Sequence, residues 1–154
     1  MRKLFTAASV YLGLGLFSGV FYREFTRAMD FGDKTQLNTL HTHFLVLGTI
    51  FFLVALALDG QFNISAVKGF DRWFIVQNVG IVWTIGMMVA NGIVHVVSGP
   101  EAWGPMYSGI AGLGHIILTV GFVWFFMLLN KALKNREREV RKANAAVQIS
   151  SGNA

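Results

Sequence analysis

The chain has 154 residues, of which 54% are hydrophobic and only 14% are charged. Soluble domains carry about 25% charged residues, so the composition predicts an integral membrane protein. The chain has no cysteine, which excludes disulfides, thiolate metal sites, iron–sulfur clusters and covalently attached haem.

Four apolar segments are each long enough to cross a bilayer, whose hydrocarbon core is roughly 30 Å thick. They are residues 4–22, 40–58, 73–97 and 107–129. The sequence therefore predicts an all-α membrane bundle over residues 1–130, with helices that run up, down, up and down. Residues 131–154 are expected to form a basic cytoplasmic tail that begins as a helix and ends in disorder.

The first segment also has the basic start and apolar run of a signal peptide. Phe21, Tyr22 and Arg23 end this run without a small-residue cleavage site, so we expect a retained helix. Gly15 and Gly19 form a GxxxG step in it, which permits close approach of another helix and would allow a homodimer.

Basic residues indicate the orientation of the bundle. With both termini in the cytoplasm, ten of the 13 lysines and arginines lie on the inner side: two before the first span, two in the middle loop and six in the tail. Only Arg23, Arg27 and Lys34 lie outside. The positive-inside rule favours this orientation. The net charge of +5 is then a signal of topology, and we expect contact with the lipid bilayer and none with nucleic acid.

All four histidines lie toward the outer side of the predicted spans. His41 and His43 are near the start of the second span, His95 is near the end of the third, and His115 is eight residues into the fourth. Eight residues of helix correspond to about 12 Å. Because an ionisable side chain at membrane depth is costly and usually functional, the four histidines are candidate ligands of a haem iron or another metal.

His43 and His115 are the predicted ligand pair for one haem b. Spans two and four are diagonal in an up-down-up-down bundle, and a haem with two histidine ligands needs imidazoles from well-separated backbones. His41 is about 200° around the helix from His43, so both cannot face one iron. His95 is the expected partner of His41; alternatively, these two are rim histidines bonded to backbone or headgroups.

Other residues near the histidines admit two interpretations each. Asn91, one turn before His95 on the same face, is the expected orienting partner of His95. Arg23 and Arg27 either contact haem propionates or are solvated loop charges. Met87 and Met88 either bind copper or pack against other helices. Small residues ahead of His115 permit either close helix packing or a flat macrocycle; they are Gly109, Ala111, Gly112 and Gly114.

The segment HTHFLVLGTIFF, residues 41–52, resembles the HxHxxxxG helix of subunit I of haem-copper oxidases. In that family the two histidines ligate two different haems, which implies that His41 and His43 are haem ligands and that Gly48 is a close-packing position. The chain departs from that subunit because it has four spans and too few histidines for two haems and a copper. The stretches YLGLGLFSGVFYREFT and TQLNTLHTHFLVLGTIFFL also resemble a bacterial family of small four-span membrane proteins of unknown function.

Two classes of function stay open. One is a haem b protein of the bacterial cell membrane that transfers electrons with an unidentified redox partner or binds O2 or NO; as an enzyme, it would be a haem-dependent oxidoreductase. The other is a copper-handling protein or an accessory subunit without haem. Hydrolase and transferase chemistry has no support, because there is no Ser-His-Asp set, no phosphate loop and no pair of intramembrane acids.

Overall fold

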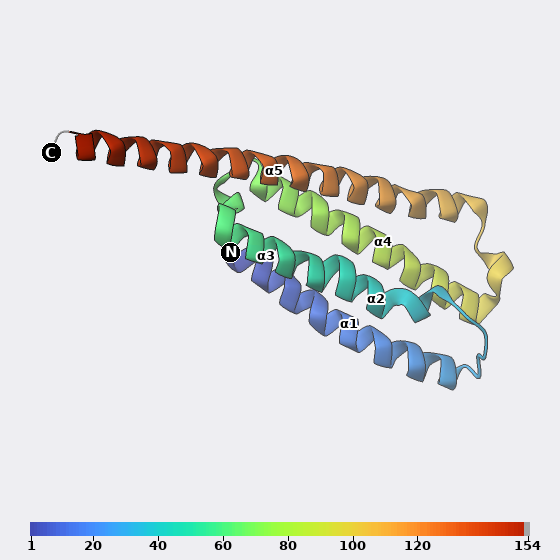
Figure 1. Cartoon of the computed structure of the whole chain (residues 1–154). Coiled ribbons are helices and arrows are strands. Elements are labelled where there is room, and N and C mark those ends of the chain that lie inside the picture. Colours follow the sequence, from blue (N-terminus) through green and yellow to red (C-terminus); the bar gives the residue numbers. More distant parts are fainter. Residues whose placement is uncertain (153–154) are drawn as a thin grey trace.

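The computed structural model describes residues 1–152, and every regular element in that range is a helix (Figure 1). The elements are α1 (Arg2–Ala28), η1 (Gln36–Thr39), α2 (Leu40–His43), η2 (Phe44–Ile50), α3 (Phe51–Phe62), η3 (Ile64–Ala66), α4 (Phe70–Ser98), η4 (Pro100–Ala102) and α5 (Pro105–Gly152). η1, α2, η2 and α3 follow one another without a break and form the second long helix, Gln36–Phe62.

Within the described residues, four helices are long and apolar enough to cross a membrane, as the sequence predicts. They begin and end outside the predicted boundaries, because the helical backbone continues past the apolar residues into polar ones. α5 continues furthest, through the basic segment up to Gly152. The predicted helical start of the tail is therefore present, and residues 153–154 of the segment expected to be disordered lie outside the described residues.

The helices pack as two antiparallel hairpins. α1 packs along the second long helix, and α4 packs along α5. The second long helix also contacts both α4 and α5, whereas α1 and α5 lie on opposite edges of the molecule in Figure 1. The arrangement is therefore more open than a square bundle, in which the first and fourth helices are neighbours.

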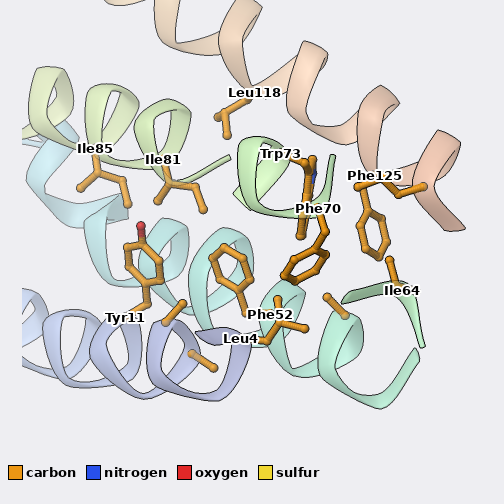
Figure 2. Close-up of a cluster of buried hydrophobic side chains, with 14 of the residues drawn as sticks. Leu4, Tyr11, Phe52, Ile64, Phe70, Trp73, Ile81, Ile85, Leu118 and Phe125 are labelled. Carbon is orange, nitrogen blue, oxygen red and sulfur yellow. The ribbon is translucent and has the colours of Figure 1, made fainter. Parts of the chain in front are cut away.

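An aromatic cluster fills the half of the bundle that holds the N-terminus. Trp73 is fully buried there, and Figure 2 shows it beside Phe70, Phe52 and Phe125. The ring centroids of Phe51 and Phe125 are 5.3 Å apart, and those of Trp73 and Phe125 are 5.1 Å apart. Between membrane helices this tight packing supplies much of the stability, because lipid is as apolar as the side chains themselves.

The other half of the bundle is fixed by the start of the second long helix. Thr35 caps η1: its hydroxyl accepts a hydrogen bond from the Leu37 amide and donates one to the Gly92 carbonyl, both at 3.3 Å. A Cβ at Gly92 would lie 2.5 Å from Leu37 Cγ, so this glycine lets η1 approach α4 closely. Asp33 and Gln36 also have the spacing of a capping box, but the structure places the cap at Thr35. The Thr35 cap positions the histidines that follow η1.

Candidate functional site

A cavity of about 450 Å³ opens among the second long helix, α4 and α5, in the half of the bundle opposite the aromatic cluster. Its wall combines polar and apolar side chains, and none of them is an acid, a lysine or an arginine. The lining residues are Gln36, Thr39, His43, Thr84, Met87, Met88, Asn91, Trp103, Ser108, Ala111, Gly112 and His115.

His43 and His115, the pair chosen from the sequence, both line this cavity. His43 Nδ1 lies 2.9 Å from the Thr39 carbonyl oxygen. Since a carbonyl only accepts hydrogen bonds, Nδ1 carries the proton, and the lone pair of the neutral ring is on Nε2. A metal-binding histidine usually has such a partner on its other nitrogen, because the bond fixes both ring orientation and tautomer.

A π-helix, η2, begins directly after His43. Its seven residues, Phe44–Ile50, widen the second long helix where it crosses α1. Gly48 lies in η2 against Tyr11: a Cβ there would be 2.5 Å from Tyr11 Cβ. The expectation that Gly48 is a close-packing position is thereby confirmed. Segments of π-helix are rare and often occur at functional sites, which supports this region as the candidate site.

The small residues before His115 differ in what surrounds them. Gly114 is a packing position, since a Cβ there would lie 3.0 Å from Trp83 Cδ1 and 3.1 Å from Thr84 Cα. Gly112 lines the cavity, and a Cβ there would have nothing within 4 Å. Gly112 therefore leaves open space beside His115 that a flat group can use.

Asn91 lies in the cavity wall with Met87 and Met88, whereas His95, the histidine that it was expected to orient, does not line the cavity. Trp103, which the sequence reasoning missed, also lines the cavity and packs against Tyr107, with ring centroids 5.3 Å apart. The only sequence signal for Trp103 is a large aromatic residue in the Gly-Pro-rich connection between α4 and α5, which is too weak to identify a cavity wall.

His41 and His95 do not line the cavity. His41 is exposed, and its Cβ is 3.9 Å from the Cβ position of Gly19 on α1. His95 packs edge-on against Phe31, with ring centroids 5.7 Å apart. The two histidines thus make separate contacts, and the structure offers no geometry that supports their predicted pairing. The reasoning that His41 and His43 face different sides of one helix holds.

Arg23 and Arg27 are both exposed near the end of α1, and neither lines the cavity. Arg23 Nε is 3.4 Å from Glu24 Oε1, its neighbour in the chain. This geometry favours the interpretation of these residues as solvated loop charges. Within residues 1–152, no group of three or more histidine or acidic side chains could hold a metal ion, so the cavity offers a pair of imidazoles and neutral donors.

The GxxxG step of α1 is used inside the chain. A Cβ at Gly15 would lie 3.0 Å from Leu45 Cδ2 and 3.2 Å from Phe44 Cβ, so this glycine receives the second long helix. The GxxxG step therefore no longer argues for a homodimer, which stays an untested prediction.

Residues 1–132 match the model of a family described as a protein of unknown function, DUF2871. Because this match covers most of the chain, the chain belongs to that family. No curated protein and no solved structure matches it. The likeness of residues 41–48 to the oxidase helix has no support from these comparisons and stays a resemblance.

Proposed function

We propose that this member of the DUF2871 family is a membrane protein that binds one haem b through His43 and His115 and transfers electrons. One observation carries the proposal: two histidines from different helices, far apart in the sequence, line one cavity. Bound there, haem would supply one-electron redox chemistry within the membrane.

The cavity has a size and a mixed polar and apolar lining that are compatible with a flat cofactor. Its volume lies in the range of about 300–1,000 Å³ that is usual for cofactor and small-molecule sites. Gly112 leaves open space next to His115, and Met87 and Met88 offer apolar surface. Haem propionates would find neutral donors at Gln36, Asn91 and Ser108, since no basic side chain lines the cavity.

The residues around the cavity would set the state of the iron ligands. The Thr39 carbonyl holds the proton on His43 Nδ1 and so presents the Nε2 lone pair for ligation. Electron transfer is favoured over gas binding, because a second histidine in the same cavity can fill the other axial position. In the proposed orientation, with both termini in the cytoplasm, the haem lies in the outer half of the bilayer.

The absorption spectrum of detergent-purified protein tests this proposal. A haem with two histidine ligands should give a sharp Soret band and resolved α and β bands after reduction. His43→Ala and His115→Ala should each lose or alter this spectrum. His41→Ala and His95→Ala are matched controls that remove an imidazole outside the cavity, and they should retain it. Unchanged haem content in both cavity variants would contradict the ligand assignment.

A Cu(I) site is the second candidate function, because both methionines of α4 share the cavity with the two histidines. Thioether and imidazole ligands together suit Cu(I), which needs no carboxylate. Met87→Leu and Met88→Leu nearly conserve side-chain volume. They should reduce copper content if copper is the ligand and should leave a haem spectrum unchanged if haem is the ligand. Metal analysis of the purified variants separates the two.

A further inference from the structure

A recess of about 320 Å³ lies at the end of the bundle away from the histidine cavity, between α5 and the connection from α3 to α4. Its lining residues are Gln61, Phe62, Asn63, Ala66, Val67, Ala132, Asn135, Arg136 and Glu139. Val67 and Ala132 are buried, whereas the charged and amide side chains of this wall are exposed. The recess therefore joins an apolar part to a polar part that is open to the surroundings.

The connection that forms one side of the recess has a fixed shape. Asn63 ends α3 in the left-handed conformation, with a φ of 54°. The Asp59 carboxylate accepts a hydrogen bond from the Ser65 amide at 2.6 Å. A Cβ at Gly69 would lie 3.9 Å from Leu128 Cδ2, so the connection also packs against α5. The recess is therefore formed before any ligand binds.

Arg136 and Glu139 give the recess one positive and one negative charge. They are three residues apart on α5, and side chains at this spacing are neighbours on a helix, with Cβ atoms about 5–6 Å apart. Within the described part of the chain, neither side chain forms an ion pair or a hydrogen bond. Both charges are therefore free to bind a ligand that itself carries both signs.

The recess lies where the apolar part of the bundle gives way to polar residues. Gln61 is three residues past the second predicted span, about 5 Å of helix, and Arg136 is seven past the fourth, about 10 Å. Figure 1 shows α5 continuing past the other helices at this end. Lipid headgroups occupy about 5–8 Å beyond the hydrocarbon core on each side of a bilayer, and a long arginine side chain can reach back toward them. In a membrane, the recess would lie at the headgroup level.

We propose that the recess binds the headgroup of a zwitterionic aminophospholipid, whose phosphate and ammonium groups are two carbons apart. The Arg136 guanidinium binds the phosphate, for which its planar set of donors is well suited. The Glu139 carboxylate binds the ammonium, together with amide oxygens of the recess wall. The proposal rests on the membrane location that is part of the proposed function, and it is independent of haem or copper.

The paired charges distinguish this site from the general attraction of the basic tail. The six lysines and arginines of the tail would favour an anionic lipid such as phosphatidylglycerol. Glu139 opposes this attraction in the recess, because an anionic headgroup offers it no cation. The recess therefore predicts a preference for phosphatidylethanolamine over phosphatidylglycerol, which is the opposite of what the tail charge alone predicts.

Native mass spectrometry of the detergent-purified full chain tests this preference. With equal amounts of the two lipids and the same acyl chains, we expect more bound phosphatidylethanolamine. Glu139→Gln should lose the preference and bind more phosphatidylglycerol. Arg136→Gln should weaken phosphatidylethanolamine binding about tenfold, the effect of losing one charged hydrogen bond. Glu137→Gln and Arg138→Gln are matched controls that remove the same charges from α5 outside the recess, and they should keep the wild-type preference.

A wild-type preference for phosphatidylglycerol would overturn the proposal, and so would an unchanged preference in both recess variants. Glycerophosphoethanolamine, the same headgroup without acyl chains, should give no adduct at the same concentration. An adduct as abundant as that of the lipid would overturn the assignment to a membrane lipid. All four substituted side chains are exposed, so the variants should fold. Haem or copper content measured in the same samples tests the proposed function separately.

Discussion

His43 has a hydrogen-bonded Nδ1 and an Nε2 that is free to act as a ligand, which is the state that a metal requires. His115 lines the same cavity from α5, one residue after the packing position of Gly114 and three after the open position of Gly112. The two side chains therefore differ from His41 and His95 in location and not in type. If both bind one haem iron, neither axial position is left for an external ligand.

Carbon monoxide binding tests this closed state. We expect the reduced wild-type protein to bind carbon monoxide slowly or weakly, because a histidine must first leave the iron. His43→Ala or His115→Ala, where either still binds haem, should bind it rapidly and shift the Soret band within seconds. The measurement is the absorbance change after mixing, with His95→Ala as the control that should behave as wild type. Fast, stoichiometric binding by the wild type would show an open axial position.

At the scale of the element, some glycines of α5 receive a neighbouring helix and others border open space. Gly112 and Gly109 lie in the same first turns of α5, and a Cβ would have open space at both, but only Gly112 lines the cavity. Gly112→Leu should therefore fill the cavity and reduce haem or copper content, while Gly109→Leu should leave it unchanged. Cofactor content per protein, measured by absorption and metal analysis, checks this. Equal loading of the two variants would place the ligand elsewhere.

The close contact between Gly48 and Tyr11 leads to a prediction about the π-helix η2. Gly48→Ala would place a methyl group 2.5 Å from Tyr11 Cβ and 2.8 Å from Tyr11 Cδ2, so α1 and η2 must separate. We expect a cost of about 1–3 kcal/mol in the free energy of unfolding, as for overpacked cores. Gly13→Ala is the control, since its Cβ would have nothing within 4 Å, and it should stabilise α1 by about 0.5–1 kcal/mol. Thermal unfolding in detergent compares them, and similar melting temperatures would contradict the role of this contact.

The sequence could predict the four apolar helices, because hydropathy and length decide them. It could also predict that His43 and His115 lie near the same end of the bundle, because successive spans run in alternating directions. It could not predict η2, since an apolar run looks the same whether its turns are α or π. It also missed the Thr35 cap, because Asp33 with Gln36 offers an equally good local pattern. The separation of His41 and His95 depends on which helix faces each histidine, and helix rotation is set by contacts such as Gly48 with Tyr11.

At the scale of the whole molecule, the open ends of both helical hairpins lie at the same end of the bundle as the N-terminus. Lys3 Nζ lies 2.7 Å from Asp71 Oδ1, so the start of α1 is beside the start of α4. The cavity is at the opposite end, together with the end of α1, which carries Arg23 and Arg27, and the following loop, which carries Lys34. The orientation of the whole bundle in a membrane therefore decides which aqueous side the cavity faces.

Protease protection tests that orientation. Ten of the 13 lysines and arginines lie before the first span, between the second and third predicted spans or in the tail, so the positive-inside rule predicts cytoplasmic termini and a cavity toward the outer face. A tag at either terminus should be protected from protease added to intact cells and digested once the membrane is opened. A protease site inserted after Gly32, in the loop between α1 and η1, is the control that should be cut from outside. Digestion of the C-terminal tag in intact cells would reverse the topology and place the cavity on the cytoplasmic side, where its redox partner would then have to be sought.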